Sequence, residues 1–409
     1  MAGGLERLYW RVLPNRSLTN RFNLSKPRVY LYCRNEEGNL QEDVITLAEG
    51  LRELGVPFSG NCDYWLESTT PGDYLIRHDA AASADDADVV VVSYTWPFRI
   101  RMKTFDLVRR PLPEGLFKKG RRYKTVYMDS HDGHRTVSWE PEFRQFDLIL
   151  RSKLNHRAWH PENMKPWVLG FTNRVSQATA GAPRFAQRKR AILVNYGASH
   201  PYPHGMRDLA ARSFEPKIQR TLPIDRTKDD LGKEPSDAYD VLMWRQTGFR
   251  FSRSYYERLK NSQAVACFCG EMIPPMPFHN PECYLVGGNK AKLRRFIYEF
   301  LAKLDPRPDR SVQWDSFRFW EALTAGCATF NVDLERYGAS LPVMPKNWEH
   351  YIGVDFDRVD DIVEQLTADS STLERIASAG RNWAFENYSQ RRMAERFLEI
   401  AGFRVPCDD

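Results

Sequence analysis

The chain has 409 residues, enough for two large domains or three of average size. Hydrophobic residues make up 42% and charged residues 27%, a globular composition that excludes a disordered or fibrous chain. The 59 Lys and Arg residues against 53 Asp and Glu residues give a net charge of +6. This balance suits an anionic ligand such as a phosphate, but it lacks the concentrated basic stripe of a dedicated nucleic-acid binder.

The N-terminal segment is basic and has no long apolar run. In residues 5–16 apolar side chains alternate with arginines, which fits either a short amphipathic helix at a membrane surface or a helix packed on the protein, and we favour the second. No stretch approaches the about 20 apolar residues of a transmembrane helix, and no secretory signal is recognisable. The seven cysteines show no paired framework, which indicates a reducing compartment. We therefore expect a cytoplasmic protein, with peripheral membrane contact through the basic N-terminus as the alternative.

The first 171 residues predict an α/β unit with a parallel sheet. Apolar runs of strand length alternate with longer segments, and residues 42–54 have the apolar spacing of a helix that ends at Gly55. The run at 89–92 is apolar on both faces, as in a parallel strand covered on both sides. The predicted strands are residues 28–33, 88–93, 124–129 and 147–151, with 166–171 as a further candidate.

A second α/β unit follows a linker. Residues 172–190, rich in Ala, Gln, Thr, Arg and Gly, are interpreted as that linker. The second unit has predicted strands at 191–196, 240–244, 263–269 and 327–332, and helices at 252–260, 290–304 and 315–325. An irregular, proline-rich excursion occupies 271–289, and the pattern from 359 to 402 is almost entirely helical. The fold class is therefore α/β with two parallel sheets in succession.

Four potential zinc ligands occur close together in the sequence. Cys267, Cys269, His279 and Cys283 could supply four soft ligands. Cys267 and Cys269, however, belong to an apolar run typical of a buried strand, where cysteines behave as small hydrophobic residues. We favour this interpretation and expect no metal.

The richest polar constellation lies at the start of the predicted helix 315–325. The first turn of a helix offers free backbone amides to an anion, and Arg318 can add a bidentate phosphate contact. Glu321 lies three residues later on the same helical face, where its carboxylate could accept hydrogen bonds from a ribose. An Arg318–Glu321 ion pair on a surface helix is the alternative.

This segment resembles the end of the glycosyltransferase group 1 families. Residues 315–326, a following strand, a Leu341-Pro342 turn and a helical tail through Trp383 and Tyr388 are similar to GT-B enzymes of the spore-maturation and exostosin-like kind. The resemblance covers roughly the last hundred residues. It implies two Rossmann-like domains facing across a cleft: an acceptor domain at 1–180, a nucleotide-sugar donor domain at 181–388, and a C-terminal helix at 389–409 that returns to the first domain.

The resemblance also implies roles for individual residues. Glu321 matches the glutamate that contacts the nucleotide ribose, and Ser316 and Arg318 match residues near the diphosphate. Arg253 and Lys260 resemble the basic pair that neutralises the diphosphate leaving group without a metal; a solvated helix face is the alternative for both. Gln313 stands where many retaining enzymes of this superfamily carry a second glutamate, so a neutral amide replaces a charge and a retaining mechanism is in doubt.

The acceptor side is expected in loops that follow strands of the first unit. An inverting transfer needs a general base, and Asp132 or His131, in the loop after the predicted strand 124–129, could serve. The alternative is a loop whose side chains satisfy local backbone amides. The loops 35–38 and 196–200 are weaker candidates.

The sequence thus predicts a hexosyltransferase-like glycosyltransferase that moves a sugar from a nucleotide diphosphate sugar, such as a UDP-sugar, to an unidentified acceptor. That acceptor could be a glycan, a small molecule, a protein or a nucleic acid. A non-catalytic nucleotide- or glycan-binding protein on the same scaffold and a sugar transferase acting on DNA bases are the alternatives. No cofactor is expected beyond the donor substrate itself.

Overall fold

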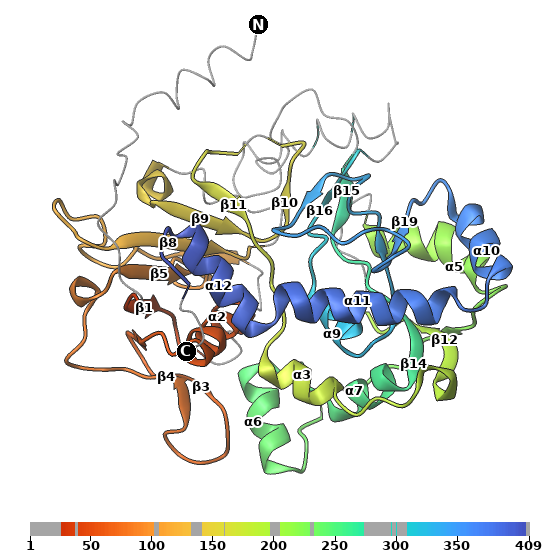
Figure 1. Ribbon diagram of the computed structural model, residues 1–409, viewed down its shortest axis with the longest axis horizontal. Helices are drawn as coiled ribbons and strands as arrows, with labels where there is room; N and C mark the ends of the chain where they lie inside the picture. Colours follow the sequence, from red (N-terminus) through yellow and green to blue (C-terminus); the bar gives the residue numbers. More distant parts are fainter. Residues whose placement is uncertain are drawn as a thin grey trace, which may run out of the picture.

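The computed structural model describes residues 26–36, 40–101, 106–131, 141–158, 160–196, 205–229, 233–273 and 309–405, together with Phe296 and Phe300. The described chain forms two parallel β-sheets with helices packed against them, one sheet in each half of the molecule (Figure 1). The predicted α/β class with two parallel sheets is confirmed.

The first half is built on a six-stranded sheet in the order β11-β9-β8-β5-β1-β2, in which every described pairing is parallel. Its central strand β5 is a run of valines that are at most 1% exposed, because both faces of the sheet are covered. The strands are β1 (Val29–Tyr32), β2 (Phe58–Gly60), β5 (Val89–Ser93), β8 (Lys124–Asp129), β9 (Leu148–Arg151) and β11 (Met164–Pro166).

The second half is built on a five-stranded parallel sheet in the order β13-β12-β14-β17-β19. One hydrophobic core runs without interruption from one face of the first sheet into the second half, and a smaller core covers the other face of the first sheet. The strands are β12 (Lys189–Leu193), β13 (Ile224–Asp225), β14 (Ser262–Ala266), β17 (Ala328–Val332) and β19 (Ile352–Val354).

Four short antiparallel pairs complete the strands: β3 (Tyr64–Leu66) with β4 (Tyr74–Ile76), β6 (Phe98–Arg101) with β7 (Asp106–Arg109), β15 (Glu271–Ile273) with β16 (Arg310–Val312), and β10 (Leu154–Asn155) with β18 (Ala339–Ser340). The last pair joins the two halves. Asn155 strengthens it, since its Nδ2 donates to the carbonyl oxygens of Ser311 at 3.1 Å and Tyr337 at 2.8 Å.

The helices lie between strands along the chain and follow the last strand, β19. The α-helices are α2 (Glu42–Glu53), α3 (Asn173–Thr179), α4 (Met206–Leu209), α5 (Glu215–Ile218), α6 (Ala238–Gln246), α7 (Arg253–Lys260), α9 (Phe317–Thr324), α10 (Val359–Ala368), α11 (Thr372–Tyr388) and α12 (Gln390–Ile400). The 3₁₀-helices are η1 (Ala84–Asp86), η3 (Pro141–Gln145) and η4 (Phe185–Gln187), and a π-helical turn, η5 (Ala210–Phe214), separates α4 from α5.

The C-terminal helix returns to the first half. Helix α11 runs along the second half, the chain turns at Ser389, and α12 lies against α2 (Figure 1). The two helices approach backbone to backbone at Gly50, because a Cβ atom there would stand 2.0 Å from the carbonyl oxygen of Gln390. The Gln390 side chain also donates to the carbonyl oxygen of Phe171 at 2.8 Å.

Three predicted elements differ from the structure. Residues 240–244, predicted as a strand, belong to helix α6, whose N-cap Asp237 accepts a hydrogen bond from the Asp240 amide at 3.0 Å. The predicted linker 172–190 contains α3, η4 and the first residues of β12, and within 166–171 only Pro166 is in a strand. The predicted helices near the N-terminus and at 290–304 lie outside the described residues, apart from Phe296 and Phe300.

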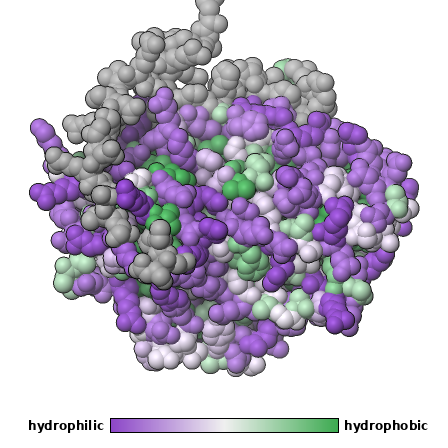
Figure 2. Space-filling view, in the orientation of Figure 1, coloured by the Kyte–Doolittle hydropathy of each residue, from purple (hydrophilic) through white to green (hydrophobic). Residues whose placement is uncertain are grey.

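The face of the molecule seen in Figure 2 is mostly hydrophilic, and its apolar residues form small separate areas. Within the described part of the chain, no helix combines the length and the apolar character needed to cross a membrane.

Replacing Gly50 with alanine tests the contact between α2 and α12. Alanine normally stabilises a helix interior by about 1 kcal/mol relative to glycine, but here its methyl group would collide with the Gln390 carbonyl. We expect Gly50→Ala to lower the free energy of unfolding by about 1–3 kcal/mol, measured by chemical denaturation. The exposed Glu53→Ala on the same helix is the control and should change stability little. A Gly50→Ala protein as stable as the parent would contradict the close approach.

Candidate functional site

The carboxyl ends of the two sheets meet around Lys153. This buried lysine follows β9, and its Nζ donates to the carbonyl oxygen of Ser130, which follows β8. Burial raises the pKa of Asp315, in the second half, and of Asp43, in the first half, and in both cases Lys153 partly offsets the increase. The ammonium group therefore lies between the halves, where ligands bind in open α/β sheets.

The start of α9 offers hydrogen-bond donors that have no partner. Ser316 is the N-cap residue, yet its side chain makes no capping hydrogen bond, and its buried hydroxyl interacts instead with the Cys269 thiol, where it partly offsets the increase in pKa caused by burial. The first backbone amides of a helix have no intrahelical acceptor. Both carboxylate oxygens of the preceding Asp315 are engaged: one accepts from the Leu169 amide at 2.8 Å and the other from Trp320 Nε1 at 2.6 Å.

Two arginines lie beside this helix start. The guanidinium carbons of Arg207 and Arg318 stand 5.3 and 5.8 Å from the centre of the same Tyr196 ring. Burial lowers the pKa of Arg207, and the charge of Arg318 lowers it further. Among the described residues no side chain accepts a hydrogen bond from Arg318, and its buried Nε has no partner. Two neighbouring cations beside the uncapped backbone amides of a helix N-terminus form a place for an anion.

Glu321 lies one turn further along α9. Its half-buried carboxylate accepts from the hydroxyl of Tyr255 at 2.9 Å and from that of Tyr256 at 2.8 Å, so both oxygens are held by tyrosines of α7. Each carboxylate oxygen can accept a second hydrogen bond. No Arg318–Glu321 ion pair is present within 4 Å, which removes that alternative for these two described residues.

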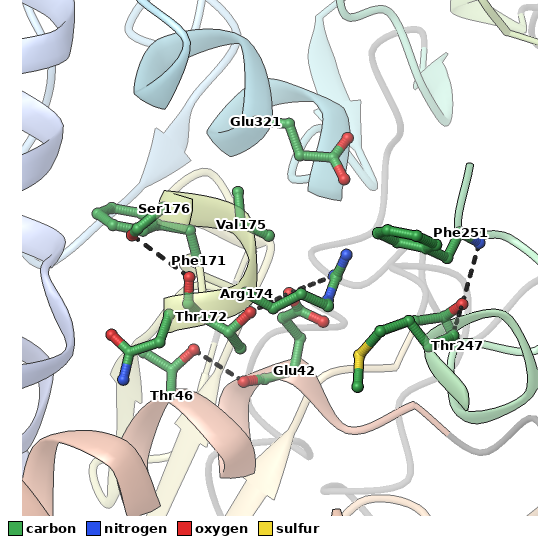
Figure 3. A network of polar contacts seen from close by, with 12 residues as sticks. Glu42, Thr46, Phe171, Thr172, Arg174, Val175, Ser176, Thr247, Phe251 and Glu321 are labelled. Carbon is green, nitrogen blue, oxygen red and sulfur yellow. Dashed lines mark hydrogen bonds and ion pairs between the residues drawn. The ribbon is translucent and has the colours of Figure 1, made fainter. Parts of the chain in front are cut away.

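A buried polar network continues from Glu321 to the first half (Figure 3). Arg174 of α3 stands between Glu321 and Glu42, as the figure shows, and donates to Glu42 Oε1 at 3.2 Å. Thr172 donates to the same oxygen at 3.1 Å. Burial raises the pKa of Glu42, and Arg174 opposes that increase.

The structure does not bring Arg253 and Lys260 together. They are the first and last residues of α7. Arg253 is 63% exposed and makes a bidentate contact with Asp240 at 2.8 and 2.9 Å. Lys260 pairs with Glu257 at 2.8 Å and precedes β14, so it lies at the amino edge of the sheet, opposite the edge where α9 begins. The predicted basic pair thus faces two different edges, and neither residue is beside Arg318.

The predicted acceptor loop is described only in part. Asp132 lies outside the described residues. His131 is 3% exposed, and its ring meets Tyr94 edge to face at 5.1 Å. The preceding Ser130 donates a short hydrogen bond to Asp43 at the start of α2, and burial raises the pKa of Asp43 to about 6. His131 is therefore held at the carboxyl edge of the first sheet, beside Lys153.

The weaker loop candidates are also partly described. In the loop after β1, Glu36 makes a bidentate contact with Arg110 at 2.6 and 3.1 Å, and the Asn35 side chain donates to the carbonyl oxygen of Asp63 at 2.8 Å. Of residues 196–200 only Tyr196 is described, and its hydroxyl donates to Glu215 at 3.2 Å.

Cys267 and Cys269 follow β14 and are buried. Burial raises the pKa of Cys269 to about 11 and that of Cys267 well above its usual value, so both thiols stay protonated at neutral pH. His279 and Cys283 lie outside the described residues. In the ranges that the structure describes, no three His, Cys, Asp or Glu side chains are grouped as a metal site.

The sequence reasoning missed Arg207, Lys153, Asp43 and Arg174. Arg207 had a usable signal, because it lies in the first turn of α4, the helix that follows the first strand of the second sheet, and phosphate ligands bind at such positions in α/β folds. Lys153 had a weaker one, as a polar residue directly after a predicted strand. Asp43 and Arg174 carried no local signal, since their partners are distant in the chain.

No protein-family model and no curated protein sequence matches the chain. Several solved structures are similar at low identity. An α-glucosyltransferase in complex with UDP-glucose and DNA containing an abasic site is 8% identical, with a TM-score of 0.49 over 92% of this chain and 99% of that chain. Anabaena Alr3699/HepE in complex with UDP-glucose is 10% identical, with a TM-score of 0.45 over 91% and 98%. A glycosyltransferase from Rickettsia africae ESF-5 is 10% identical, with a TM-score of 0.43 over 92% and 98%.

The buried Glu49 makes the link between α2 and α3 sensitive to pH. Its carboxylate accepts from the Asn173 amide at 2.8 Å, and burial raises its pKa to about 8. A carboxyl whose pKa is raised on folding stabilises the fold below its unfolded pKa, about 4.3, and that stability is lost as pH rises towards 8. Glu49→Gln keeps an acceptor for the amide and removes the titration. We expect the variant to match the parent at pH 4 and to exceed it by about 1–3 kcal/mol at pH 9.

The measurement is the free energy of unfolding by urea at several pH values. Glu364→Gln, at an exposed position of α10, is the control and should leave the pH profile unchanged. Parallel profiles for Glu49→Gln and the parent would show that Glu49 titrates normally.

Proposed function

We propose that the chain is a glycosyltransferase of the group 1, GT-B kind, which transfers a sugar from a nucleotide diphosphate sugar. The observation that carries this proposal is the start of α9, where the Arg318 guanidinium has no hydrogen-bond acceptor among the described residues, the Ser316 side chain does not cap the helix, and Glu321 follows one turn later. The diphosphate and the ribose are adjacent in such a donor, and Arg318 and Glu321, which would bind them, are adjacent on one helix. The alternation of strand and helix places the helix start at the carboxyl edge of the sheet.

In this proposal the cations of the chain stabilise the leaving group. Negative charge develops on the diphosphate as the bond to the sugar breaks, and fixed donors are most effective where such charge appears. Arg207 and Arg318 share one flank of the site, and Lys153 approaches from the first half. We prefer this set to Arg253 and Lys260, because these last two lie at opposite ends of α7. Metal-independent transfer belongs to the same proposal and is tested below.

The acceptor is proposed to approach the carboxyl edge of the first sheet. His131 is held there through the backbone of Ser130, which Asp43 and Lys153 fix from two sides. His131, or the neighbouring Asp132, would take the proton from the acceptor hydroxyl. A cytoplasmic location completes the proposal.

A thermal-shift screen tests the donor class. Purified protein is heated with UDP, GDP, dTDP, ADP or CMP, each with and without EDTA, because a ligand that binds only the folded state raises the melting temperature. UDP comes first, because two of the solved structures above contain UDP-glucose. A shift with one nucleoside diphosphate that EDTA does not change supports the proposal. No shift with any of them contradicts it, and binding without slow hydrolysis of the cognate nucleotide sugar would indicate a non-catalytic binding protein.

Substitution of the arginines distinguishes the two basic sets. Removing a charge-assisted contact to phosphate costs about 1.5–3 kcal/mol, which is about 10- to 100-fold in affinity. We expect Arg318→Ala and Arg207→Ala to weaken UDP binding by this amount and uridine binding far less, measured by isothermal titration calorimetry. Arg253→Ala and Lys260→Ala should change the dissociation constant less than threefold, about 0.6 kcal/mol. If Arg253→Ala and Lys260→Ala weaken UDP binding more than Arg318→Ala and Arg207→Ala do, Arg253 and Lys260 bind the diphosphate instead.

A further inference from the structure

The hydrogen bonds around Arg174 form a chain with only one possible direction. Its Nη1 donates to the hydroxyl oxygen of Tyr256 at 2.8 Å, and a guanidinium can donate but never accept. The Tyr256 oxygen is therefore the acceptor, and its own proton is available for Glu321 Oε1, which lies 2.8 Å away. The order of donation is Arg174 to Tyr256 to Glu321.

Arg174 stays charged in this position. Burial alone would lower its pKa, but Tyr256, Glu42 and Glu321 together raise it above the usual value. The Phe251 and Tyr256 rings also lie near the guanidinium, with their centres 5.9 and 6.0 Å from its central carbon. A permanent cation next to the tyrosine oxygen strengthens the hydrogen bond that the tyrosine then donates, because bonds in such a chain polarise one another.

The two oxygens of Glu321 are held in different ways. Oε2 accepts from Tyr255, for which no hydrogen bond to Arg174 is found in the described chain. Oε1 accepts from Tyr256, which accepts from Arg174, and Arg174 also donates to Glu42 of the first half. The rotamer of Glu321 is thus fixed partly by its own half and partly by the other.

We propose that Arg174 is a positioning residue for nucleotide recognition: acting through Tyr256, it orients the Glu321 carboxylate towards the donor ribose and ties that orientation to α2 of the first half. The proposal rests on the proposed function, in which Glu321 binds the ribose. The proposal explains why the charged Arg174 side chain is buried here. The Glu42 carboxylate does not require it, because protonation or the hydrogen bond from Thr172 could satisfy that group.

Tyr256→Phe is the most direct test, because it removes one hydroxyl and leaves the Arg174–Glu42 contact. We expect the dissociation constant for UDP, measured by calorimetry, to rise about 10-fold, corresponding to about 1.4 kcal/mol. The KM for the nucleotide-sugar donor should rise in parallel, with kcat falling less. Tyr337→Phe is the matched control, since it removes a buried tyrosine hydroxyl that donates to Asp355 at 3.0 Å outside this network. The control should leave UDP affinity unchanged.

Arg174→Lys and Glu321→Gln complete the test. Arg174→Lys keeps the charge but not the planar fork, and it should weaken UDP binding several-fold. In the Glu321→Gln background, Tyr256→Phe should have no further effect, because the group that it orients has been altered. A Tyr256→Phe protein with lowered melting temperature but unchanged affinity would show a structural role only.

The two proposals fail in different ways. If Glu321→Gln weakens UDP binding while Tyr256→Phe and Arg174→Lys do not, the positioning role of Arg174 is overturned and the ribose role of Glu321 stands. If Glu321→Gln itself leaves UDP affinity unchanged, or if the parent protein does not bind UDP, the proposed geometry of the donor site is overturned and the inference with it.

Discussion

The contact between α12 and α2 is the constraint on which the arrangement of the two sheets depends. The helices touch backbone to backbone at Gly50, and backbone atoms, unlike side chains, cannot rotate away to allow a different separation. Two other crossings add to this contact, the β10–β18 pair and the hydrogen bond between Asp315 and the Leu169 amide. Together they hold the carboxyl ends of both sheets at one junction, which is where Lys153, Ser316 and His131 are found.

The charged groups at that junction divide into paired and unpaired ones. Arg151 and Asp129 are both fully buried and bound at 2.5 Å, which satisfies each charge inside the fold. The charge of Arg174 is likewise paired with Glu42, and its Nη1 donates to Tyr256, although its buried Nε has no hydrogen-bond partner among the described residues. Arg318, in contrast, has no carboxylate partner among the described residues and lies beside the Tyr196 ring and a second cation, Arg207. Leaving a cation unpaired costs stability, and the cost is recovered when an anion binds. The proposed function follows from this difference.

Much of the fold could be predicted from the sequence, because strand-length apolar runs and helix caps are local signals. The valine run of β5 and helix α2, which ends before Gly55, are examples. The prediction failed for α6, where a short apolar run fits a strand or a helix equally well and the deciding cap, Asp237, was overlooked. The role of Arg253 and Lys260 at the diphosphate stays a prediction, and seven residues along α7 separate their backbones by about 10 Å. Lys153 and Arg174 depend on contacts between segments far apart in the sequence, which no local pattern records.

The continuous core has a consequence for how the protein can be divided. Apolar side chains of α2, α12 and the second sheet belong to one cluster, so a cut at residue 180 or after α11 would expose part of that cluster on both fragments. Each sheet has the topology of an autonomous unit, yet neither half contains all the residues that cover its own apolar surface. The two halves have separate sheets, but their shared core makes them one cooperative unit. We expect fragments of this chain to associate with each other before either becomes fully ordered.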